Sequence, residues 1–220
     1  MATTQTLIGE VRDRIRDYSS STRDEKILEK LNEGLSAVAG QILLPDLITS
    51  GEVTAEGSRA YVNLPDNYHR EVLLVTSASA LGRVKLNMSW QRFLTLYPTL
   101  DNQGGNICEV VVRGRQLFYQ PLPSVRDTLT IHYYRKPTPL TLEDKTAEPE
   151  AIPEHLHMRL LASYAAREFF DKIEDGIEGP KINYTNQNRA FATALLDLID
   201  FLPPQDGLPQ EIEDDADYIQ

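Results

Sequence analysis

The sequence predicts an α+β fold: a helical bundle built from N-terminal and C-terminal helix pairs, an inserted antiparallel β module, and an extended C-terminal tail. Three observations lead to this class. Apolar residues recur at helical spacing at both ends of the 220-residue chain, short β-rich runs separated by turn residues fill its middle, and its last residues are strongly acidic. Since neither helix pair can bury its apolar face alone, we expect the two pairs to meet. The predicted parts are 1–47, 48–136, 137–202 and 203–220.

The first part carries two amphipathic helices. Apolar residues three or four apart predict a helix over about 5–18, with Thr3 and Thr4 as candidate N-caps. A second helix begins at Thr22 and Glu25, which have capping-box spacing, and Pro45 ends it. The first helix also holds arginines that alternate with aspartates, which we interpret as a solvated helix face rather than a nucleic-acid contact. These arginines are Arg12, Arg14 and Arg16.

The middle part is typical of a meander or small barrel, because its β-rich runs are short and are bounded by Gly, Pro and Asn. Gly114 can supply the positive φ of a tight hairpin turn. Ser89 can cap a short helix that plugs one open end of the sheet. The turn-rich residues after it are predicted to form an exposed, mobile tip: Asn102, Gln103, Gly104, Gly105 and Asn106. The predicted strands are 51–55, 59–64, 71–78, 83–88, 107–112, 115–120 and 127–135.

Two more helices are predicted in the third part. Pro153 suits a helix start, and the apolar pattern continues to about residue 173. After a Gly-rich break, a stripe from Tyr184 to Leu198 predicts a last helix over about 184–201, which Pro203 and Pro204 end. Segment 203–220 has six acidic and no basic residues, so we expect it to be disordered in the free subunit.

The net charge of −11 is unevenly distributed. Residues 48–136 carry ten Lys and Arg against seven Asp and Glu, whereas the acidic excess lies at the C-terminal end. A tight DNA-binding protein needs a basic surface for the phosphates, so this distribution argues against that class. The single Cys108 excludes an internal disulfide. No apolar run is long enough to span a bilayer, so no membrane partner is expected.

No residue cluster predicts catalysis. His155 and His157 are two apart on a helix and point to different faces, while His69 and His132 are isolated in the strand region. We find no phosphate-binding loop, Rossmann glycine pattern or nucleophile elbow. The acidic run at 143–150 is interpreted as a solvated loop. The sequence therefore predicts a protein that is not an enzyme, with no catalytic, cofactor-binding or metal-ligating residues and no cofactor.

Four blocks occur in an order that resembles one protein family. They are LSAVAGQILLPDL at the end of the first helix pair, LPDNY at 64–68, the hairpin VVVRGRQLFYQPLP, and YYRKPTPLT followed by AIPEHLHMRLLASYAAREFF. Over residues 4 to about 200 the chain resembles the head-to-tail adaptor, or connector, proteins of tailed bacteriophages. The resemblance implies a structural virion protein at the neck between capsid and tail, assembled in the host cytoplasm.

The resemblance also implies partners. Such adaptors form a homo-oligomeric ring, commonly of twelve subunits, that docks under the portal protein and provides the attachment surface for tail proteins of the nozzle or tail tube. Double-stranded DNA passes through the channel without sequence-specific binding. An acidic body agrees with this, because it repels the duplex rather than gripping it. In segment 203–220 we expect apolar anchors and acids to contact the portal or a neighbouring subunit: Ile212, Tyr218, Ile219, Asp206 and Glu211.

Two alternatives stay open at this point. The chain could be another structural part of a virion, such as a tail-tube or tail-completion protein, which would show mainly β packing in a tube. It could also be a small-ligand binding or hydrolytic domain whose β module forms a pocket around His69 or His132.

Overall fold

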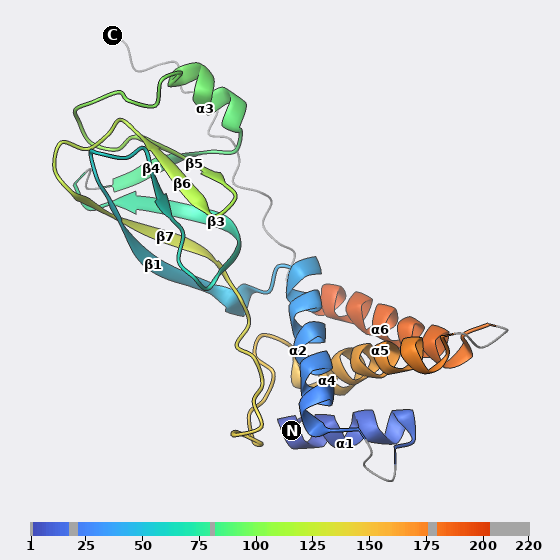
Figure 1. Ribbon diagram of the computed structural model, residues 1–220. Helices are drawn as coiled ribbons and strands as arrows, with labels where there is room; N and C mark the ends of the chain where they lie inside the picture. Colours follow the sequence, from blue (N-terminus) through green and yellow to red (C-terminus); the bar gives the residue numbers. More distant parts are fainter. Residues whose placement is uncertain (1, 18–21, 80–81, 176–179, 203–220) are drawn as a thin grey trace. The chain divides into compact units, whose positions relative to one another are not determined.

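The computed structural model describes residues 2–17, 22–79, 82–175 and 180–202. Contacts divide the chain into two compact units. One, the β unit, is Leu47–Lys136, and the other, the helical unit, is Met1–Asp46 together with Pro137–Gln220. Figure 1 shows the elements of both.

The β unit contains one seven-stranded sheet with the strand order β1-β7-β3-β4-β5-β6-β2. All neighbouring strands are antiparallel except β4 and β5, which are parallel. The two end strands of this order, β1 and β2, also contact each other, so the sheet closes almost into a barrel (Figure 1). The strands are β1 (Ile48–Ala55), β2 (Tyr61–Asn63), β3 (Tyr68–Ser77), β4 (Gly82–Asn87), β5 (Glu109–Arg113), β6 (Gln116–Gln120) and β7 (Asp127–Arg135).

The barrel interior is a continuous apolar core. Along β7, buried Leu129, Ile131 and Tyr133 alternate with half-buried residues, as expected where one sheet face is covered. Tyr119 of β6 lies in the same core. Its hydroxyl accepts a hydrogen bond from the Glu56 backbone N–H at 2.9 Å and donates one to the Glu56 carbonyl at 3.0 Å. This side chain therefore links β6 to the end of β1 where the sheet is not continuous.

A short helix, α3 (Trp90–Leu96), packs on β4 and β5. Ser89 caps it as predicted, since its hydroxyl accepts a hydrogen bond from the Arg92 backbone N–H at 3.3 Å. Phe93 is fully buried. The predicted hairpin turn is also confirmed, because Gly114 has φ of 62° between β5 and β6.

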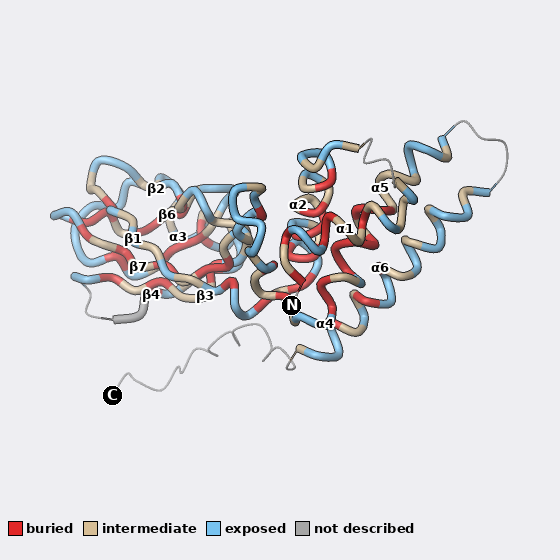
Figure 2. Tube along the Cα trace, turned by 90° about the horizontal axis from the view of Figure 1, so that it is seen from below, coloured by how far each residue is buried: buried red, intermediate tan, exposed pale blue. Residues whose placement is uncertain are grey.

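The helical unit is built on a central helix. It comprises α4 (Glu154–His157), a π-helical turn (Met158–Ala162) and α5 (Ser163–Ile173) in direct succession. Three other helices pack on this helix: α1 (Thr4–Ile15), α2 (Asp24–Gln41) and α6 (Ile182–Phe201). Figure 2 shows buried residues concentrated in α1, α2 and the central helix, whereas most of α6 is exposed or half-buried.

The predicted fold class, a helical bundle with an inserted antiparallel β module, is wrong. The chain has a β-rich fold, a nearly closed barrel of seven strands in a mixed sheet, accompanied by helices. The sheet is mixed because α3 and the loop after it carry the chain from the end of β4 back before β5 begins, so the two strands run in the same direction. Within the described residues, α6 packs mainly on the central helix and has few contacts with α1 or α2, so no four-helix core forms.

Two local predictions in the first helix pair are also wrong. The N-cap of α2 is Arg23, not Thr22, and Arg23 makes no side-chain cap. The backbone of Thr22 instead bonds to side chains near the end of α1. Its N–H donates to the Asp17 carboxylate at 2.7 Å, and its carbonyl accepts from the Arg12 guanidinium at 2.8 Å. Arg12 is therefore part of a structural contact between the two helices and does not belong to a solvated face.

Arg14 likewise has a structural role, although its alternation with aspartates predicted a solvated helix face. From α1 its guanidinium donates to the Ser163 hydroxyl at 2.6 Å, the Met158 carbonyl at 3.3 Å and the Gln187 side chain at 3.2 Å. A π-helical turn leaves backbone groups without their usual partner, and Met158 begins that turn. One side chain thus joins α1, the central helix and α6.

Candidate assembly surfaces

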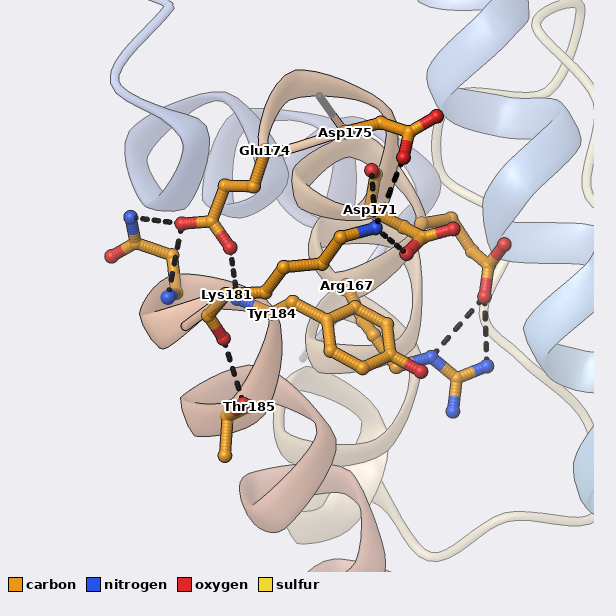
Figure 3. Close-up of polar contacts among 9 residues, drawn as sticks. Arg167, Asp171, Glu174, Asp175, Lys181, Tyr184 and Thr185 are labelled. Atoms are coloured by element: carbon orange, nitrogen blue, oxygen red, sulfur yellow. Dashed lines mark hydrogen bonds and ion pairs between the residues drawn. The ribbon is translucent and has the colours of Figure 1, made fainter. Parts of the chain in front are cut away.

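The hairpin of α5 and α6 is held by a polar clamp near its turn (Figure 3). Lys181 is the N-cap residue of α6, but its side chain does not cap the helix. Glu174, at the end of α5, caps α6 instead. The Glu174 carboxylate accepts from the backbone N–H groups of Asn183 and Tyr184 at 3.1 and 3.2 Å. The Lys181 ammonium pairs with Asp171 at 2.9 Å. The clamp fixes the start of α6 against the central helix.

The electrostatics of the clamp follow from these contacts. Partial burial acts to raise the pKa of Glu174, but hydrogen bonds from Tyr184 and Asn183 outweigh it and hold the pKa below its usual value. The hydrogen bond to Asp171 raises the pKa of Lys181. Both groups are therefore charged at neutral pH, as a cap and an ion pair require.

Beyond the clamp, α6 exposes apolar side chains on its outer face. Leu196 and Ile199 are 62% and 49% exposed, and Phe201 is 59% exposed. The opposite stripe of the same helix buries Phe191, Ala194 and Leu198. A surface helix usually has one apolar stripe, so the second one indicates a contact that the isolated chain does not satisfy. We call Leu196 and Ile199 the α6 outer face, since Phe201 lies nearer to the buried stripe and its ring contacts His155.

The predicted tip residues, Asn102 to Asn106, are all exposed. Their backbone is nevertheless bonded to the segment after β6. The Leu122 N–H donates to the Asn102 carbonyl at 2.8 Å, and the Gly104 N–H donates to the Leu122 carbonyl at 3.2 Å. Gly104 and Gly105 have φ of 91° and 123°, which favour glycine. The tip therefore has a defined backbone and presents side chains such as Gln103 to solvent.

The other predicted partner-binding residues, Asp206, Glu211, Ile212, Tyr218 and Ile219, lie outside the described residues. So does the whole of segment 203–220, which was predicted to be an extended tail.

The histidines do not gather into a site. His157 is buried, and its Nε2 lies 2.7 Å from the Ile152 carbonyl, whereas the His155 ring packs against Phe201. A hollow of about 410 Å³ near the ends of β1 and β2 is lined by neither His69 nor His132. Among the residues that the structure describes, no cluster of His, Cys, Asp and Glu could hold a metal ion. In the same residues, no helix is both long and apolar enough to cross a membrane.

Comparison with known proteins decides the family. The family model described as SU10 adaptor protein matches residues 2–210, nearly the whole chain. The chain belongs to this adaptor family. No curated protein gave a significant match.

The predicted relation to bacteriophage head-to-tail adaptors is thereby confirmed. Adaptors of this kind are structural proteins of the virion neck that interact with portal and tail proteins. The α6 outer face is the surface that the sequence analysis missed. The sequence carries a signal for it, because the apolar Leu196 and Ile199 fall between the positions of the predicted stripe and give the helix a second apolar face.

Proposed function

We propose that this chain is the subunit of a homo-oligomeric ring that docks under the portal, continues the DNA channel and provides the attachment surface for the tail. The family match over residues 2–210 carries this proposal. The resemblance to head-to-tail adaptors favours a ring of about twelve copies, and a closed ring needs repeated contacts between two different surfaces of one subunit. The particle would assemble in the host cytoplasm.

The α6 outer face supports the lateral contact between subunits. Leu196 and Ile199 lie on a helix that the clamp at Glu174 and the contacts of Phe191 hold in place. An apolar face on a rigid element is suited to a permanent interface, because little conformational freedom is lost when it is covered. The occupant that we propose is a second copy of the chain.

The charge distribution supports a channel that does not hold DNA. The chain has a net charge of −11, and a wall of the same sign as the duplex lowers its affinity for phosphates. Sequence-specific readout needs side chains that reach base edges, and Arg12 and Arg14 of α1 are bound internally instead.

Two further segments complete the proposal. The tip Asn102–Asn106 would contact a tail protein, of the nozzle or the tail tube, because its polar side chains are exposed on a backbone that is already ordered. Segment 203–220 would contact the portal or a neighbouring subunit through Ile212, Tyr218 and Ile219, with Asp206 and Glu211 meeting basic residues.

The test is binding to purified portal rings, measured as the mass of the complex by native mass spectrometry. The account predicts a complex in which the protein adds as a ring. The variant Gln103→Ala with Asn106→Ala keeps the backbone bonds to Leu122, so it should bind the portal normally and lose affinity for the tail only. If the protein does not bind the portal but forms tubes by itself, the result would favour a tail-tube role instead.

A further inference from the structure

Three aromatic rings lie in a row on the outer surface of the β unit. Tyr61 of β2 stands opposite Phe118 of β6, and their ring centroids are 5.5 Å apart. Trp90, at the start of α3, packs edge-on against Phe118 with centroids 4.7 Å apart. The alternate residues Val62 and Leu117 face the core, so the row is on the outside of the barrel. We call Tyr61, Phe118 and Trp90 the aromatic row.

An arginine lies near each end of the row. The Arg113 guanidinium is 4.8 Å from the centre of the Trp90 ring. Near the other end, Arg59 and Tyr61 line the hollow of about 410 Å³, together with Thr54 and Glu56. Neither Arg59 nor Arg113 has an ion-pair partner within the described part of the chain. Both cations are exposed and available to an anionic partner.

The row ends at the discontinuity of the barrel. β1 and β2 are the end strands of the sheet, and no ladder of hydrogen bonds joins them in the described residues. An unpaired strand edge can accept an extended segment by strand addition. The hollow beside Tyr61 lies at this edge and has room for side chains of such a segment.

These features define the chemistry of the occupant. Trp, Tyr and Arg are the residues that most often dominate binding at protein interfaces. Two unpaired arginines favour an acidic partner, and three adjacent rings favour one that carries apolar or aromatic anchors. Segment 203–220 has this composition, with six acidic residues, no basic ones, and Ile212, Tyr218 and Ile219. The β unit carries the complementary sign, with ten Lys and Arg against seven Asp and Glu in residues 48–136.

We propose that the aromatic row binds segment 203–220 of a neighbouring copy. The donor is a neighbour because the proposed function places copies side by side in a ring, and this part of the inference rests on that function. The binding surface itself does not depend on the ring. Each subunit would then be joined to the next by a second contact, separate from the α6 outer face.

Trp90 is the only tryptophan of the chain, so its fluorescence reports directly on the row. The first measurement uses the full chain with Ile212→Ser, Tyr218→Ser and Ile219→Ser, whose own segment lacks anchors. Titration with a synthetic peptide of residues 203–220 should give a saturable change in Trp90 emission. When Arg113→Ala is introduced into this triple-serine chain, the Kd for the peptide should rise about tenfold. This is the loss of affinity expected for one charge contact next to an aromatic anchor. The matched control is Arg115→Ala, on the other side of Gly114, which should leave Kd nearly unchanged.

A second measurement identifies the donor. The triple-serine chain is mixed with a full chain that carries Tyr61→Ser and an intact segment. A change in Trp90 emission on mixing shows that the segment passes between copies. If the peptide binds but mixing changes nothing, the segment does not come from a neighbour, and that part of the proposal fails. This outcome is distinct from loss of portal binding, which tests the proposed function.

Two results would overturn the binding surface. The first is that the peptide does not change Trp90 emission, or that it binds the Arg113→Ala and Arg115→Ala variants with equal affinity. The other comes from a single-stranded oligothymidine of eighteen nucleotides in the same assay. Rings and arginines also bind single-stranded DNA, so tighter binding of the oligonucleotide than of the peptide would assign the row to nucleic acid.

Discussion

The β unit and the helical unit bury their apolar residues in different ways. In the β unit the sheet curves until its end strands touch, and one core fills the interior. In the helical unit, α1, α2 and α6 all pack on one central helix, and α6 leaves Leu196, Ile199 and Phe201 exposed. A sheet that closes has few free edges, whereas helices packed on a common partner leave outer faces uncovered. The difference teaches that the helical unit, unlike the closed sheet, leaves an apolar helix face uncovered, and this is the face that we propose for the contact between subunits.

The largest expected effect tests whether the two cores are separate. Leu129 lies in the barrel core and Leu31 in the helical unit, and both are fully buried. Leu129→Ala and Leu31→Ala should each reduce the free energy of unfolding of their own unit by about 2–5 kcal/mol, since each leaves a cavity. Trp90 fluorescence reports unfolding of the β unit alone, while far-UV circular dichroism near 222 nm reports mainly the helices. An equal shift of both signals by either variant would show one shared core.

A smaller effect compares two glycines. A Cβ at Gly57 would lie 2.4 Å from the Pro123 backbone carbonyl, while one at Gly34 would lie 3.0 Å from the Tyr164 ring. Backbone moves less easily than a side chain, so Gly57→Ala should cost about 1–3 kcal/mol. Gly34→Ala should be nearly neutral, because alanine is favoured over glycine in the interior of α2 by roughly 0.5–1 kcal/mol. Chemical denaturation of the two variants measures this, and a greater loss for Gly34→Ala would contradict the packing described.

The smallest effect on stability concerns acid. Burial acts to raise the pKa of Asp127, but hydrogen bonds from Ser77 and Ser79 outweigh it and keep the pKa below its usual value. A carboxylate with a lowered folded pKa stabilises the protein above its unfolded pKa, about 3.9 for Asp, and this stability is lost as pH falls through the folded pKa. The β unit should therefore weaken below about pH 4. Ser77→Ala removes the 2.7 Å bond to the carboxylate, so the folded pKa of Asp127 should rise toward its unfolded value and the loss of stability below about pH 4 should become smaller. Trp90 fluorescence in pH titrations checks this, and identical acid profiles would exclude a role for Asp127.

Local signals in the sequence predicted most elements but not their pairing. The Ser89 cap, the Gly114 turn and the Thr3 cap each depend on a few adjacent residues, and all three are present in the structure. The parallel pairing of β4 and β5 depends on where α3 and the following loop return the chain, which no residue pattern states. The packing of α6 mainly on the central helix, with few contacts to α1 and α2, is likewise decided by interactions between distant segments.

Side-chain roles were hardest to predict where a charged residue is used internally. Arg14 looked like part of a solvated face because only its neighbours along α1 were visible in the sequence, yet its partners lie on the central helix and α6. The α6 outer face was missed for the opposite reason. Its residues were taken to be outside the apolar stripe, and only the burial of Leu198 and Phe191 on the other side shows which stripe is free.

The most direct test of the account is the mass of the protein in solution with and without the α6 outer face. Leu196→Ser with Ile199→Ser changes exposed residues, so each unit should keep its stability within about 0.5 kcal/mol. The matched control, Asn186→Ser with Arg189→Ser, changes exposed polar positions of the same helix. Native mass spectrometry with portal rings should show ring-sized additions for the unmodified chain and the control, and only single copies for the Leu196→Ser, Ile199→Ser variant. A ring of unchanged mass in that variant would contradict the account.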